Sequence, residues 1–75
     1  MDQQELKAFG VLLQEARKNK GISQEKLAEL SDLHRTYISD LERGLRNPTL
    51  STIVTLAHAL EMTASELLKE LKYEK

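Results

Sequence analysis

Two short helix-forming segments separated by only three residues constrain the fold of this chain more than any other feature. The first covers about residues 24–31, ending at residue 30 or 31, and the second covers about residues 35–43. A connection this short forces a large angle between two helices. The two segments and their connection carry apolar residues where packing against a core requires them, at Leu27, Ala28, Leu33, Ile38 and Leu41. Residues 24–43 are therefore predicted to form a helix-turn-helix.

Capping residues divide the remainder of the chain into three further helices. Asp2 and Gly21 bracket the first, over residues 3–20. Thr49 is the expected N-cap of the fourth, and a Thr-x-x-Glu capping box at Thr63 opens the fifth, while Ser23 is the expected cap of the first motif helix. The alternation of apolar and polar residues that is typical of strands is absent. The sequence predicts an all-α fold in which five helices form one domain over residues 1–75.

Apolar residues at helical spacing predict which faces of these helices are buried. The inward stripes of the first and fourth helices are expected at Leu6, Phe9, Leu13, Ala16, Arg17, Ile53, Leu56, Ala57 and Leu60. The fifth helix is expected to carry Leu67, Leu68 and Leu71, and residues 73–75 are expected to fray. Because a chain of 75 residues buries only about 60% of its unfolded surface, the core is small.

Several classes of protein are excluded by what the sequence lacks. There is no cysteine, which excludes disulfides and thiolate metal sites. No apolar run approaches the roughly 18 residues of a membrane span, and the first residues lack the features of a signal peptide. A soluble cytoplasmic protein is expected.

Residue patterns that support catalysis or hold a cofactor are not recognisable. His34 and His58 fall on different helices with no carboxylate cluster at ligand spacing, so no metal site is expected. The chain has no glycine-rich phosphate loop and no nucleophile–base pair. The sequence therefore predicts neither an enzyme nor a protein that takes a cofactor or a small-molecule ligand.

The distribution of charge matters more than its total. The chain has 11 basic and 12 acidic residues, a net charge of −1, which argues against a nucleic-acid binder that relies on bulk positive charge. Residues 17–46 carry seven basic and five acidic residues, a net of +2, whereas the rest carries four and seven, a net of −3. A modestly basic motif thus stands on an acidic scaffold, and nonspecific affinity for DNA is expected to be weak.

Three short runs carry a family resemblance: residues 23–28 (SQEKLA), 37–44 (YISDLERG) and 46–50 (RNPTL). Over about residues 9–68 the chain resembles the Cro/lambda-repressor-like (XRE) helix-turn-helix family. Residues 34–39 (HRTYIS), followed by Arg46 and Asn47, are similar to the controller proteins of restriction–modification systems, which are short homodimers. The resemblance implies a domain that binds double-stranded operator DNA as a homodimer and regulates transcription without a cofactor.

The chemistry of the second motif helix agrees with that expectation. With Ile38 at the centre of its buried face and about 100° per residue, the opposite face and its flanks are polar, at Arg35, Thr36, Ser39, Asp40 and Arg43. Such a helix can enter the major groove with its N-terminal residues at the base edges. Arg35 suits a guanine, Thr36 suits a thymine, and Tyr37 offers a hydroxyl and a ring. A merely solvated helix face is the alternative interpretation.

The resemblance also implies roles for residues that do not read bases. Contacts to the DNA backbone are implied for Ser23, Gln24, Ser39, Arg43, Arg46 and Asn47. The free amides and the dipole at the start of the first motif helix would also attract a phosphate at Gln24. Arg17 and Glu42 are implied to form a partly buried ion pair between the first and third helices.

Apolar residues beyond the predicted core indicate where two copies would meet. A single helix-turn-helix reads few bases, so such proteins bind as twofold dimers. We expect the homodimer interface on the fourth and fifth helices, at Leu50, Val54, Leu68 and Leu71.

Two departures from the family pattern and two alternative functions remain. Asp32 and Glu61 stand where the family often has glycine, and His34 stands where a Ser or Thr cap is common, so its imidazole is free to cap the helix or to reach DNA. An antitoxin-type protein-interaction module and a phage-type repressor are the alternatives to a controller protein.

Overall fold

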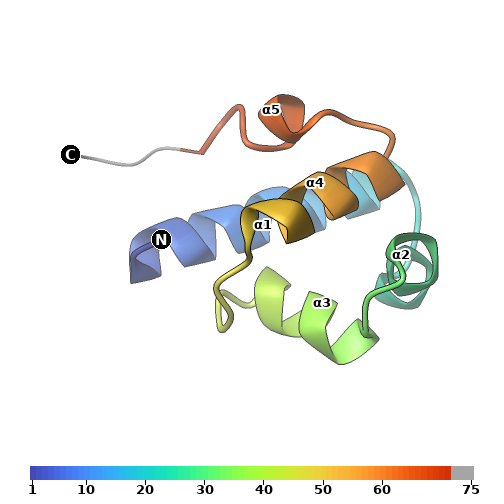
Figure 1. The fold of residues 1–75 in the computed structure, drawn as a ribbon, viewed down its shortest axis with the longest axis horizontal. Helices are drawn as coiled ribbons and strands as arrows, with labels where there is room; N and C mark the ends of the chain where they lie inside the picture. The colour runs from blue at the N-terminus through green and yellow to red at the C-terminus, as the bar shows by residue number, and fades with distance from the viewer. Residues whose placement is uncertain (72–75) are drawn as a thin grey trace.

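Five helices follow one another along residues 1–71, the part of the chain that the structure, a computed structural model, describes. No strand occurs in this part, so the all-α prediction is confirmed (Figure 1). The helices are α1 (Gln3–Asn19), α2 (Gln24–Ser31), α3 (Arg35–Glu42), α4 (Leu50–Ala59) and α5 (Ala64–Leu67).

Side-chain caps begin four of the five helices at the predicted residues. The Asp2 carboxylate and the hydroxyls of Ser23, Thr49 and Thr63 each accept a hydrogen bond from a backbone N–H three residues on. At the starts of α1 and α5 a glutamate returns the bond, which completes a capping box. The exception is α3, where the N-cap His34 makes no capping bond with its side chain.

Left-handed residues follow the first four helices. Gly21 (φ 76°) and Gly44 (φ 74°) adopt this conformation at no steric cost. Asp32 (φ 59°) and Glu61 (φ 60°) do so as well, each at a cost of about 1 kcal/mol or more. The two positions where the family resemblance predicts glycine thus have the backbone that glycine favours. Asp32 is the C-cap of α2, and this single left-handed residue makes the short turn into α3 possible.

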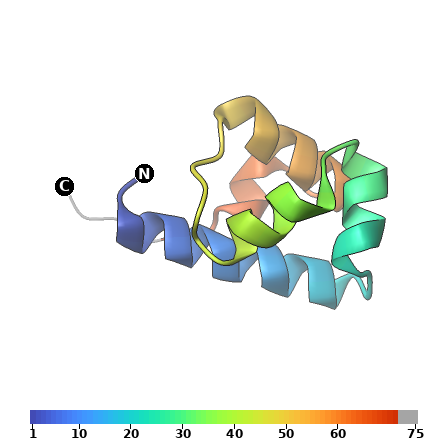
Figure 2. The ribbon, with the colours of Figure 1, turned by 90° about the horizontal axis from the view of Figure 1, so that it is seen from below.

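The core lies between the five helices: α1 packs on α3, α2 packs on α3 and α4, and α5 packs on α4 and α1 (Figures 1 and 2). Its buried members include most of the predicted inward residues: Phe9, Leu13, Leu27, Ala28, Ile38, Leu41, Ile53, Leu56, Ala57, Leu60 and Leu67. In the view of Figure 2, α3 lies across the front of the domain, with α1 along its lower edge and α4 above it. One side of α3 is therefore buried and the other faces outward.

The crossing of α1 and α3 depends on two glycines. A Cβ atom at Gly10 would lie 2.5 Å from the backbone oxygen of Glu42 and 2.6 Å from that of Leu41. A Cβ atom at Gly44 would lie 2.9 Å from Cγ of Lys7. These contacts with backbone atoms leave no room for a larger residue at position 10. The close approach holds the end of α3 against the first half of α1.

The last helix is shorter than predicted. Beyond Leu67 the amides of Lys69 and Leu71 donate to oxygens three residues back, so the chain turns more tightly than an α-helix. This turn brings Leu68 and Leu71 partly into contact with the core. Leu68 and Leu71 were predicted to lie on the fifth helix and to be exposed. The first prediction was wrong, because α5 ends at Leu67. The second is only partly right, because both side chains are partly buried. Residues 73–75, expected to fray, lie outside the described residues.

Candidate nucleic-acid interface

The outer face of α3 presents two unpartnered polar side chains. Ile38 and Leu41 are fully buried on the inner face, whereas Arg35 and Thr36 are exposed in the first turn. Among residues 1–71, neither of these two side chains forms a hydrogen bond or an ion pair with the rest of the domain. The structure thus places Arg35 and Thr36 together, on an element whose other side is fixed by the core.

Tyr37 is less exposed than these two residues. It is partly buried against the core, and its hydroxyl is 3.5 Å from Oγ1 of Thr52 on α4. The guanidinium of Arg46 lies 4.9 Å from the centroid of its ring, the geometry of a cation–π contact. Only the part of the Tyr37 side chain that the core leaves uncovered is available for the predicted role at the bases.

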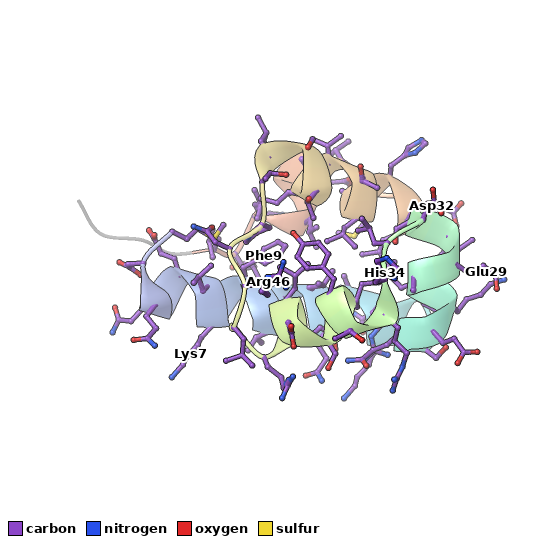
Figure 3. All side chains as sticks on the ribbon, turned by 60° about the horizontal axis from the view of Figure 1, so that its bottom comes forward. Lys7, Phe9, Glu29, Asp32, His34 and Arg46 are labelled. Atoms are coloured by element: carbon purple, nitrogen blue, oxygen red, sulfur yellow. The ribbon has the colours of Figure 1, made fainter. Side chains whose placement is uncertain are left out.

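An open pocket of about 400 Å³ lies between the start of α3 and the segment that follows it. Its lining residues are Asp32, Leu33, His34, Thr36, Tyr37 and Arg46. Figure 3 shows Arg46 folded back over the domain toward this region, while Asp32 and Glu29 point outward at the other end. His34 does not cap α3 with its side chain, so of its two predicted roles the capping role is excluded.

The basic residues at the end of α3 surround a carboxylate. Nη2 of Arg43 donates to Oδ1 of Asp40 at 2.8 Å, and Nη1 of Arg46 lies 3.9 Å from Oδ2. Arg43, Arg46 and Asn47 are exposed, as a role at the DNA backbone requires. The helical pattern placed Asp40 and Arg43 on the same outer face of α3 and did not identify them as a pair. The spacing of three residues between Asp40 and Arg43 is the signal that was available for this pair.

A buried carboxylate ties three helices together behind this surface. Glu42 accepts from Nε of Arg17 at 2.7 Å, from Nη2 of Arg17 at 3.1 Å and from Nε2 of Gln24 at 3.0 Å. Arg17 also donates through Nη1 to the backbone oxygen of Ile22 at 2.9 Å. The implied Arg17–Glu42 pair is therefore present. Its hydrogen bond raises the pKa of Arg17, an effect that burial of the guanidinium partly offsets.

The start of α2 is engaged inside the domain more than expected. The Ser23 hydroxyl accepts from the backbone N–H of Lys26, and one N–H of the Gln24 amide is held by Glu42. Sequence reasoning missed the contact between Gln24 and Glu42, since nothing in the spacing of residues 24 and 42 indicates it. The second N–H of the Gln24 amide is the donor that remains for a phosphate.

No group of three or more His, Asp or Glu side chains within residues 1–71 could hold a metal ion. Over the same residues, every helix is too short or too polar to cross a bilayer.

The comparison with known families agrees with this geometry. A model described as "Helix-turn-helix" matches residues 13–67, which is more than half of the chain. The chain therefore belongs to the helix-turn-helix family, as its sequence resemblance predicted. It is 57% identical over 47 residues to the control protein C.SmaI of Serratia marcescens, a match to 63% of this chain and 56% of that protein. It is also 49% identical over 61 residues to the control protein C.BamHI of Bacillus amyloliquefaciens, covering 80% of this chain and 75% of that protein.

A solved structure extends the comparison to three dimensions. The fold matches the restriction–modification controller protein C.Esp1396I with a TM-score of 0.86 and 33% sequence identity, over 93% of this chain and 92% of that one. That crystal structure holds a C.Esp1396I tetramer in complex with its natural 35-base-pair operator.

Proposed function

We propose that this protein is a transcriptional regulator of the restriction–modification controller type, which binds operator DNA in a sequence-specific manner. The observation that carries the proposal is the division of α3 into a buried face and an outer face that presents Arg35 and Thr36. A helix anchored in this way can enter a major groove without losing its own packing. The control proteins named above support the choice of regulator type. The protein needs no cofactor, catalyses no reaction and acts in the cytoplasm.

Recognition is divided among three groups of side chains. Arg35 and Thr36 read base edges, and Tyr37 contributes from the side of the groove. The start of α2, at Ser23 and Gln24, faces a phosphate through its amides. The remaining contacts to the DNA backbone come from Ser39, Arg43, Arg46 and Asn47.

The homodimer is formed through α4 and the segment that follows α5. Leu50 and Val54 are 72% and 49% exposed and stand four residues apart, on one face of α4. Leu68 and Leu71 add the part of their surface that the core leaves uncovered. The twofold axis sets the two α3 helices about one turn of DNA apart, roughly 34 Å.

Selection from a random library of DNA duplexes at a stated salt concentration tests this function. A palindromic sequence should be enriched, because a twofold dimer reads the same half-site twice. Enrichment of an unsymmetrical sequence would contradict the dimer, and failure to enrich any sequence would contradict the regulator.

A further inference from the structure

One acidic side chain, Asp40, lies among the basic groups of the candidate interface. Its carboxylate is 2.8 Å from one nitrogen of Arg43 and 3.9 Å from one nitrogen of Arg46. The Asp40 side chain is only 20% exposed, whereas those of Arg43 and Arg46 are 62% and 57% exposed. The acid therefore lies behind two guanidinium groups that face solvent. It reduces the net charge of the cluster from +2 to +1 at the place where phosphates would arrive.

This reduction weakens binding to DNA of any sequence. Affinity that comes from phosphate contacts rises with the number of counterions that the protein displaces, and each neutralised phosphate adds about 0.9 to the salt slope. A carboxylate that shares the arginines with an incoming phosphate lowers this number. The loss does not depend on sequence, because phosphates are the same on every duplex.

The same carboxylate also fixes where the arginines point. Asp40 stands on α3 and accepts a hydrogen bond from Arg43 at 2.8 Å. Arg46 lies 3.9 Å from the other carboxylate oxygen, with its guanidinium 4.9 Å from the centroid of the Tyr37 ring. An oriented guanidinium binds best where the phosphates lie at matching positions. That match exists on the operator, where base contacts set the register, and is absent on a duplex that the protein meets in random registers.

We propose that Asp40 is a specificity-determining residue, which lowers the affinity for DNA in general and recovers the loss on the operator by orienting Arg43 and Arg46. The proposal rests on the proposed function. It explains why an acid stands within the surface that must approach a polyanion. It also assigns the protein a source of discrimination that makes no contact with a base.

Fluorescence anisotropy titrations with two duplexes test this role. One duplex carries the sequence enriched in the library selection, and the other is a scrambled duplex of equal length and composition. The variants are Asp40→Ala, which removes both charge and acceptor, and Asp40→Asn, which keeps an acceptor oxygen for Arg43. Glu61→Gln is the matched control, because it removes one charge and breaks the ion pair with Lys20 between the ends of α1 and α4. Circular dichroism confirms that each variant is folded.

For Asp40→Ala, affinity for the scrambled duplex should rise by about fivefold at 0.15 M salt, the value of one further phosphate contact. Affinity for the selected duplex should stay near that of the wild type, so the ratio of the two affinities falls. Asp40→Asn should give the same gain on the scrambled duplex and a smaller fall in the ratio, and Glu61→Gln should change neither affinity.

Two results would overturn the role of Asp40. The first is an unchanged or reduced affinity of Asp40→Ala for the scrambled duplex, and the second is an equal gain on both duplexes. A wild-type protein that does not prefer the selected duplex would instead overturn the proposed function, and the role of Asp40 with it.

Discussion

The ion pair between Arg17 and Glu42 offers the sharpest test of how the recognition helix is held. The two side chains are 10% and 2% exposed, so their charges are almost fully removed from water. Replacing Glu42 with leucine deletes three hydrogen bonds at once, two from Arg17 and one from Gln24. Arg17 then keeps one bond, to the backbone oxygen of Ile22, and remains a buried cation without a counter-charge.

The expected cost follows from this burial. Removing one partner of a buried ion pair destabilises a protein by about 3–5 kcal/mol. At 0.05–0.15 kcal/mol per residue, a domain of this length has a total stability of about 4–11 kcal/mol. A loss of about 3 kcal/mol should lower the melting temperature by at least 12 °C. Glu42→Leu is therefore expected to leave the domain close to unfolding at 37 °C.

A double-mutant cycle measured by urea unfolding separates the pair from its surroundings. The variants are Arg17→Met, Glu42→Leu and the combination of both. Each single variant should lose about 3–5 kcal/mol, and the double variant should lose less than either, because two packed apolar side chains leave no charge buried. An exposed ion pair contributes less than about 1 kcal/mol to the free energy of unfolding. A loss that small for Glu42→Leu would refute the claim that burial makes this pair essential. The claim would also be refuted if the double variant lost as much stability as the two single variants added together.

Four further outcomes are expected. Gly10→Ala places a Cβ atom 2.5 Å from a backbone oxygen of α3. Urea unfolding should show a loss of about 1–3 kcal/mol in the free energy of unfolding, despite the better helix propensity of alanine. A variant as stable as the wild type would contradict the close approach. Val54→Glu should give a folded monomer with weak operator binding in analytical ultracentrifugation and anisotropy, and a dimer of unchanged affinity would count against the α4 interface. Arg35→Ala should make the free energy of operator binding about 1–3 kcal/mol less favourable and relax selectivity at one base pair. Arg46→Ala should weaken binding to all sequences and lower the salt slope of the binding constant by about one. If Arg35→Ala weakened binding to all sequences equally, base reading by Arg35 would be excluded. Hydrogen bonds from its N-cap residue lower the pKa of Glu66 from the ordinary 4.5, so its contribution to stability should be present above pH 4.5 and lost as the pH falls through the lowered pKa. Urea unfolding of Glu66→Gln against pH should show a smaller acid loss, and a profile equal to that of the wild type would exclude this contribution.

The helix starts and the core could be predicted because they depend on residues that are close together in the sequence. Ser23, Thr49 and Thr63 cap the helices that follow them, and each cap depends on residues only three positions apart. The apolar spacing predicted the three buried residues of α4 and the buried residue that ends it, Leu60. The pair of Arg17 and Glu42 was reached differently, through the resemblance to the family, since a separation of 25 residues carries no local signal.

The features that escaped prediction depend on contacts between distant segments. Gly10 stands in the middle of a good helical pattern, and only the path of α3 shows why no side chain fits there. Tyr37 lies on the flank of α3, and its partial burial comes from the core and from an approach of its hydroxyl to Thr52 on α4, 15 residues along the chain. The end of α5 was predicted too late because helical spacing of Leu68 and Leu71 does not distinguish a continued helix from a tight turn onto the core.

The two faces of α3 have a consequence for how such proteins diverge. Ile38 and Leu41 fasten one side to the core, while Arg35 and Thr36 on the other side are bound by nothing in residues 1–71. A substitution at either outer position leaves the folding free energy almost unchanged, so selection for stability does not oppose it. Duplicated genes of this kind can therefore acquire different binding sites by single steps. Two such copies in one cell would come to bind different DNA sites, and so regulate different genes, while both still fold.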